Sequence, residues 1–179
     1  EFDFLRGSAT KGFSASAGST ESLLLLSWNE VSMYPAGRSS DGLTCEARVR
    51  LPDGWKYGTS LETQSQAAGE IRFAPCSYTT LIDSPVLAGA HFRVVDLAPG
   101  DPVAQRLDMA CDSEAGLEIP EGQIAALRRL MKEAKLLFGG RHFRHYDFLM
   151  TLSDQTAHFG LEHHESSDDR ARERTWLDD

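Results

Sequence analysis

A single long helix pattern follows a series of short strand patterns, and this change of period is the strongest constraint on the fold. Between residues 121 and 138 the apolar side chains recur at spacings of three and four, the period of an amphipathic helix. Pro120 precedes the pattern, Glu121 suits the positive end of the helix dipole, and Gly139 follows as a stop signal. The sequence therefore predicts a helix over about 121–138.

Upstream of this helix the apolar residues are grouped in short segments bounded by Gly, Pro, Asp or Ser. Residues 44–51 alternate apolar and polar side chains with a period of two, which is typical of a half-buried strand. Further strand candidates are Leu23–Leu26 and the segments 70–75, 90–97 and 105–111. Several short strands separated by turns favour a mainly antiparallel, sandwich-like β layer. We therefore expect a β-rich N-terminal domain over residues 1–117.

The part of the chain after residue 117 has a different pattern. The helix is followed by a strand pattern at about 146–153 and by a polar, extended segment at about 158–166. One helix and two strands are too few to bury both faces of their own sheet. We therefore expect residues 118–179 to be the incomplete start of a second domain, and the whole chain to belong to the α+β class.

Charge, hydropathy and cysteine spacing exclude several kinds of function. The net charge is −9, whereas a nucleic-acid partner requires a basic face. No apolar run reaches the roughly 18–20 residues of a membrane span. Cys45, Cys76 and Cys111 are widely spaced without a CxxC motif, so we expect buried free thiols rather than a zinc ribbon.

The segment HFGLEHHESS, residues 158–167, gathers three histidines and two glutamates. Such side chains are zinc ligands, but the chain has no HExxH motif. His163 and His164 are neighbours, so on a strand they point to opposite faces. His158 could share a face with Glu162 or His164 in an extended segment, but that spacing is not diagnostic. We therefore expect no metal site within this chain.

The same segment offers two other kinds of chemistry. Ser166 and Ser167 lie near His163, but the absence of a GxSxG elbow disfavours a serine nucleophile, and we expect no catalytic residue in this chain. Glu162 could hold an ammonium group through charge-assisted hydrogen bonds. Gly160 would let a ligand backbone approach closely. From these residues alone, a surface strand with solvated charges is the alternative.

The wider sequence resembles the glycyl aminopeptidase family of gluzincin zinc metallopeptidases. The likeness covers about residues 20–178 and is carried by LSWNEVSMYPAG, LPDGWKYGTSLE, SYTTLIDSPVLAG and LFGGRHFRHYDFLMTLSDQTAHFGLEHHESSDDR, with the spelling G-L-E-H-x-x-S inside the last segment. The resemblance implies a β-rich N-terminal domain followed by a thermolysin-like catalytic domain. In that family one zinc is bound through HExxH and a downstream Glu, and a PDZ domain usually follows.

The resemblance also implies roles for the segment 158–166. Glu162 matches the glutamate that holds the free α-amine of the substrate in the larger aminopeptidase family. Gly160 and Leu161 match the strand backbone that pairs with the substrate, and His163 stands where that family has Asn. We therefore expect a peptide with a free N-terminus as substrate, with a small first residue such as Gly or Ala. We also expect a soluble bacterial protein of the cytoplasm or periplasm.

The chain reaches Asp179 without an HExxH motif. We therefore expect the zinc ligands to lie beyond Asp179, this chain to bind no zinc and to be inactive alone, and the rest of the catalytic domain to be its partner. An exposed strand edge would also allow a dimer. The alternative hypothesis is a non-catalytic, β-rich module that binds a peptide or protein.

Overall fold

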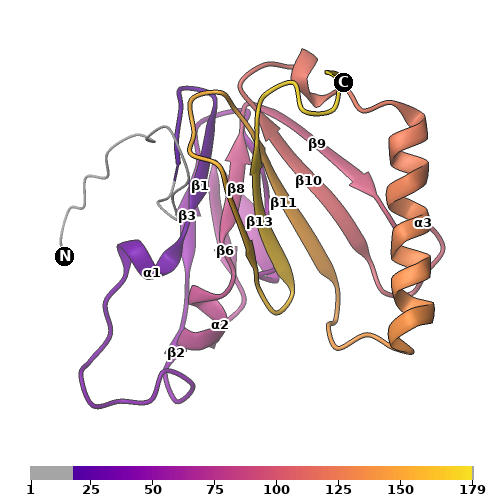
Figure 1. The fold of residues 1–179 in the computed structure, drawn as a ribbon. Helices are drawn as coiled ribbons and strands as arrows, with labels where there is room; N and C mark the ends of the chain where they lie inside the picture. The colour runs from indigo at the N-terminus through magenta and orange to yellow at the C-terminus, as the bar shows by residue number, and fades with distance from the viewer. Residues whose placement is uncertain (1–17, 179) are drawn as a thin grey trace.

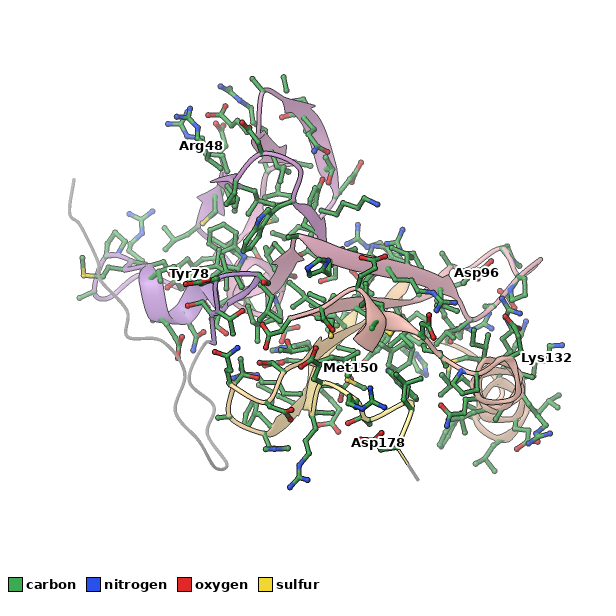
Figure 2. All side chains as sticks on the ribbon, turned by 90° about the horizontal axis from the view of Figure 1, so that it is seen from above. Arg48, Tyr78, Asp96, Lys132, Met150 and Asp178 are labelled. Carbon is green, nitrogen blue, oxygen red and sulfur yellow. The ribbon has the colours of Figure 1, made fainter. Side chains whose placement is uncertain are left out.

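Three of the four sheets and one long helix are stacked on one another in residues 18–178, the part of the chain that the computed structural model describes. Three clusters of buried apolar side chains join these four layers. Figure 2 shows the molecule from above. Across it one meets in turn Tyr78, then Met150 of the largest sheet, then Lys132 of the long helix. The fold is α+β, as the sequence predicts.

The first two layers are small antiparallel sheets that face each other across an apolar cluster. One sheet has the order β3 (Arg48–Arg50), β6 (Glu70–Phe73) and β5 (Thr63–Ala67). The other has the order β1 (Leu23–Leu26), β8 (Val86–Gly89) and β4 (Lys56–Gly58). The same cluster is covered by α1 (Trp28–Val31), α2 (Tyr78–Ile82) and the paired short strands β2 (Thr44–Cys45) and β7 (Cys76–Ser77).

The sheet β1-β8-β4 is buried on both faces, and this explains the uninterrupted leucines of β1. Leu23 and Leu25 pack toward the largest sheet, whereas Leu26 packs into the first cluster. In β8, Leu87 and Ala88 divide between the two sides in the same way. A strand covered on both faces has no need for polar alternation.

The third layer is a five-stranded sheet with the order β12-β13-β11-β10-β9. Its strands are β9 (His91–Asp96), β10 (Gln105–Cys111), β11 (Tyr146–Leu152), β12 (Phe159–Glu162) and β13 (Ser166–Ala171). The pairs β10–β11 and β11–β13 are parallel, and the two outer pairs are antiparallel. Parallel neighbours need a long crossover. Here the crossover from β10 to β11 contains the short helix η1 (Ala115–Leu117) and α3 (Glu121–Phe138), and α3 forms the fourth layer (Figure 1).

Helix α3 occupies the residues that the apolar spacing predicts. Gly139 ends it in the left-handed conformation, with φ 70°, and donates its N–H to the Lys135 carbonyl. Ile124 is buried against the five-stranded sheet. The last apolar residues are at least 76% exposed, and they are Leu136, Leu137 and Phe138. None of the described helices is long and apolar enough to cross a membrane.

The segment expected to be one strand at about 158–166 forms a hairpin instead. Strand β12 ends at Glu162, the His163 N–H donates to the Ser166 carbonyl at 2.8 Å, and β13 starts at Ser166. Strand β13 is charged yet largely buried, because Asp168 and Arg170 form an ion pair at 2.6 Å. Charged side chains enter an interior when they are paired in this way.

Two boundaries predicted from the sequence, one of a domain and one of a strand, do not agree with the observed strand pairing. The expected division after residue 117 falls inside one sheet, because β10 before it is hydrogen-bonded to β11 after it. The chain passes from one sheet to the next between Gly89 and His91. The predicted strand 44–51 is split into β2 and β3, because β2 pairs with β7 and β3 pairs with β6.

Candidate functional site

A cleft of about 570 Å³ lies where β12 meets α1 and the end of α2. It is therefore formed by parts of the chain more than a hundred residues apart. Its walls come from three separate parts of the sequence and are Ser27, Asn29, Glu30, Thr79, Ile82, Asp83, Pro85, Phe159, Leu161, Glu162, His163 and Asp168. We call it the edge cleft.

The edge cleft is acidic, with four carboxylates in its wall. Asp168 is paired with Arg170, and Asp83 accepts hydrogen bonds from the residues after β12. The carboxylate of Glu162 is exposed and forms no hydrogen bond or ion pair within residues 18–178. Glu30, from α1, lines the same cleft. An acidic, partly exposed cleft of this kind attracts a cation.

Neighbouring groups respond to this negative charge. Burial raises the pKa of the Tyr146 hydroxyl, and the charges of Asp169 and Glu162 raise it further. Burial also raises the pKa of Asp169, and Asp168 and Glu162 add to that rise. A cation bound here would therefore be attracted by these carboxylates. It would in turn lower their pKa and favour their ionised form.

Strand β12 is the edge of the five-stranded sheet, and among the described strands it pairs only with β13. Gly160, Leu161 and Glu162 are all exposed, Leu161 to 44%. A Cβ at Gly160 would have no heavy atom within 4 Å, so the space beside this residue is open. An unpaired edge offers N–H and C=O groups to which an extended peptide can add.

The structure places the four predicted site residues together at this edge and its end. His163 follows Glu162 and lines the edge cleft, while His164 lines a separate, larger cleft of about 930 Å³. The two adjacent histidines lie in the turn after β12 rather than on a strand, so the strand period does not apply to them. The His163 ring lies 3.0 Å from Asp83, measured between Nδ1 and Oδ1.

Within residues 18–178 no three His, Cys, Asp or Glu side chains are grouped closely enough to hold a metal ion. The chemistry that can be assigned to the described residues is binding and orientation of a cationic, extended ligand.

Glu30 and Asp83 were not among the sequence-predicted site residues. Both lie in segments that carry the family resemblance, one in LSWNEVSMYPAG and the other in SYTTLIDSPVLAG. Their local sequence resembles ordinary surface turns, and only the packing of α1 and α2 beside β12 brings them to the cleft.

Comparisons with known proteins agree with this architecture. Residues 6–90, just under half of the chain, match the Peptidase M61 N-terminal domain. An aminopeptidase N family protein from Idiomarina loihiensis has a similar structure, with a TM-score of 0.69 and 21% identity over 90% of this chain and 27% of that one. An M1 zinc metallopeptidase from Deinococcus radiodurans gives 0.53 and 19% over 92% and 39%.

No curated protein sequence matches the chain significantly. The chain spans only 27% and 39% of the two solved structures, which are much longer. At these identities the likeness concerns the fold. The chain therefore has the α+β fold of the N-terminal region of M1 and M61 peptidases.

Proposed function

We propose that this chain is the substrate-binding N-terminal part of a zinc-dependent aminopeptidase similar to the glycyl aminopeptidases. In this proposal Glu162 holds the α-ammonium group of a peptide, and the backbone at Gly160 and Leu161 pairs with the peptide. One observation carries the proposal: the edge strand β12, whose outer side has no partner among the described strands, ends in an exposed carboxylate inside an acidic cleft.

The geometry suits recognition of a chain end. An ammonium group donates charge-assisted hydrogen bonds to a fixed carboxylate, whereas an internal peptide nitrogen carries no charge. An edge strand fixes the register of the peptide by β-addition. In an enzyme of this kind zinc supplies the Lewis acid and the activated water. The residues of this chain supply the orientation of the peptide.

The remaining catalytic domain is the partner that this proposal requires. The end of α3 exposes Leu136, Leu137 and Phe138 side by side in the sequence, each at least 76% exposed. Exposed apolar groups of this kind mark surfaces that another protein part covers. Further catalytic-domain elements packed on this end of α3 would bury them. A second copy of the chain is the competing occupant, and light scattering would reveal it as a dimer.

The test is kinetic and uses the intact enzyme. Glu162→Gln should lower kcat/KM for glycine p-nitroanilide by at least about 30-fold, because losing one partner of a charge pair costs about 2–5 kcal/mol. Zinc content should not change. Glu133→Gln is the matched control, since Glu133 is an exposed carboxylate on α3 paired with Arg129. Unchanged turnover in Glu162→Gln would contradict the assignment.

The alternative function is a non-catalytic module that binds peptides. The same free edge of β12 favours it, because β-addition requires no hydrolysis. The two functions differ in one result with the intact protein. A module would bind glycine amide through Glu162 without turning over any free-amine substrate.

A further inference from the structure

We infer that Asp83 is a positioning residue for the substrate-binding edge: it clamps the turn after β12 to the first part of the molecule and so fixes the place of the Glu162 carboxylate. This inference rests on the proposed function. Asp83 does not reach the substrate in this scheme. It acts through His163 and His164.

Both oxygens of the Asp83 carboxylate are used on this turn. The His163 ring is 3.0 Å away, from Nδ1 to Oδ1, and the His164 backbone N–H donates to Oδ2 at 2.9 Å. A carboxylate only accepts hydrogen bonds, so the Nδ1 atom of His163 carries the hydrogen. The His163 side chain is 11% exposed and the Asp83 side chain 38% exposed, so the histidine side of this contact is largely buried and the carboxylate is partly open to water.

Asp83 is itself held by a rigid part of the fold. It caps the C-terminus of α2, and its N–H donates to the carbonyl of Thr79 and Leu81. Three residues later the chain enters β8, whose four residues are all buried. Because the backbone of Asp83 is held by α2 and β8, the turn that binds its carboxylate is held in a fixed position relative to the core.

The turn after β12 depends on such a support. Strand β12 has four residues and pairs on one side with β13, and the turn closes with the bond from His163 N–H to the Ser166 carbonyl. Glu162 immediately precedes His163. Any shift of the turn therefore moves the carboxylate that is proposed to hold the ammonium group. A displacement of about 1 Å at a binding group can cost roughly 10²-fold in rate.

The experiment is a double-mutant cycle in the intact enzyme. Asp83→Ala and His163→Ala should each lower kcat/KM for glycine p-nitroanilide by roughly 10-fold to 10²-fold. The double variant should lose no more than Asp83→Ala alone, since that change already removes the contact with the His163 ring together with the one to the His164 N–H. His163→Asn should restore most of the rate, because its amide nitrogen occupies the place of Nδ1.

The matched control is Glu114→Ala, which removes a second histidine–carboxylate contact, from Glu114 to His91 at 3.2 Å. This control should keep wild-type kinetics. Additive losses in the cycle, or an unchanged rate in Asp83→Ala, would overturn the inference. An equal loss in His163→Ala and His163→Asn would also overturn it.

A second readout separates this inference from the proposed function. Amide hydrogen exchange should become faster at His163, whose N–H donates to the Ser166 carbonyl, and at His164, whose N–H donates to Asp83, in Asp83→Ala, while exchange in β8 stays slow. If the intact wild-type protein has no aminopeptidase activity, the proposed function fails and the exchange experiment still tests the clamp. Unchanged exchange at these two amides would overturn the clamp whatever the enzyme does.

Discussion

Two regions of this molecule are rich in carboxylates, and they differ in whether the carboxylates have hydrogen-bond partners. In the inner cluster, between β4, β10 and β11, Asp147 is fully buried and accepts from Arg106 Nε at 2.6 Å and from His145 Nδ1 at 2.8 Å. Asp108 is 3% exposed beside it. In the edge cleft, Glu162 is exposed and has no such partner within residues 18–178. The difference shows that partners, rather than residue type, separate a structural acid from a candidate ligand-binding acid.

The largest expected effect would come from removing the centre of the inner cluster. Asp147→Ala leaves Arg106 and His145 without their shared acceptor. A hydrogen bond to a charged group is worth about 1.5–3 kcal/mol, and Arg106 is 43% exposed and can be hydrated, so we expect a loss of about 3 kcal/mol. The free energy of unfolding in urea measures this change. Asp178→Ala, which removes an exposed contact with Arg174, should leave the urea midpoint nearly unchanged. Equal midpoints in the two variants would erase the distinction between the regions.

A pH titration would sharpen the comparison. Burial and the neighbouring Asp147 raise the pKa of Asp108 from 3.8 to about 7. Between about pH 4 and 7 the folded state therefore holds a proton that the unfolded chain releases. The stability that Asp108 contributes is complete below about pH 4 and is lost as the pH rises toward 7. Asp108→Asn should remove this loss, which amounts to at most about 1.4 kcal/mol per pH unit. Urea unfolding at pH 4 to 8 gives both curves, and parallel curves would refute the raised pKa.

Two glycines test the same contrast with a single methyl group each. A Cβ at Gly58 would lie 2.7 Å from Asp108 Cβ in the inner cluster. Gly58→Ala should therefore lower the free energy of unfolding by about 1–3 kcal/mol. Gly160→Ala meets no atom within 4 Å and should change stability by less than about 0.5 kcal/mol. Thermal melts measure both changes.

Gly160→Ala should nevertheless raise KM for peptide substrates in the intact enzyme. The new methyl group would stand where the peptide backbone approaches β12. An unchanged KM would mean that no backbone passes this residue. Gly58→Ala should show the reverse pattern, with lower stability and an unchanged KM at temperatures where it is folded.

The parts of the fold that follow one chemical period were predictable from sequence. Helix α3 was recognisable because its apolar spacing, Glu121 and Gly139 all indicate the same element. Strand β5 (Thr63–Ala67) was missed because all five residues are polar or small and exposed. Strand β13 was missed because the pairing of Asp168 with Arg170, which allows their burial, is invisible in a linear charge pattern.

The candidate site was predictable in part. Gly160, Leu161 and Glu162 were found from sequence, and the structure brings them to one exposed edge. Their role in binding a substrate stays a prediction. Glu30 and Asp83 required the folded structure, because their place beside β12 depends on how the β1-β8-β4 sheet packs on the five-stranded sheet.

The order of the five-stranded sheet has a consequence for how the chain is made on the ribosome. Strand β13 is the last strand along the chain, yet it lies between β12 and β11 (Figure 1). Until residue 171 has been synthesised, β11 keeps one side open, although β9 and β10 were completed long before. The nascent chain therefore carries an unpaired strand edge throughout the translation of β12, and such an edge can pair with another chain.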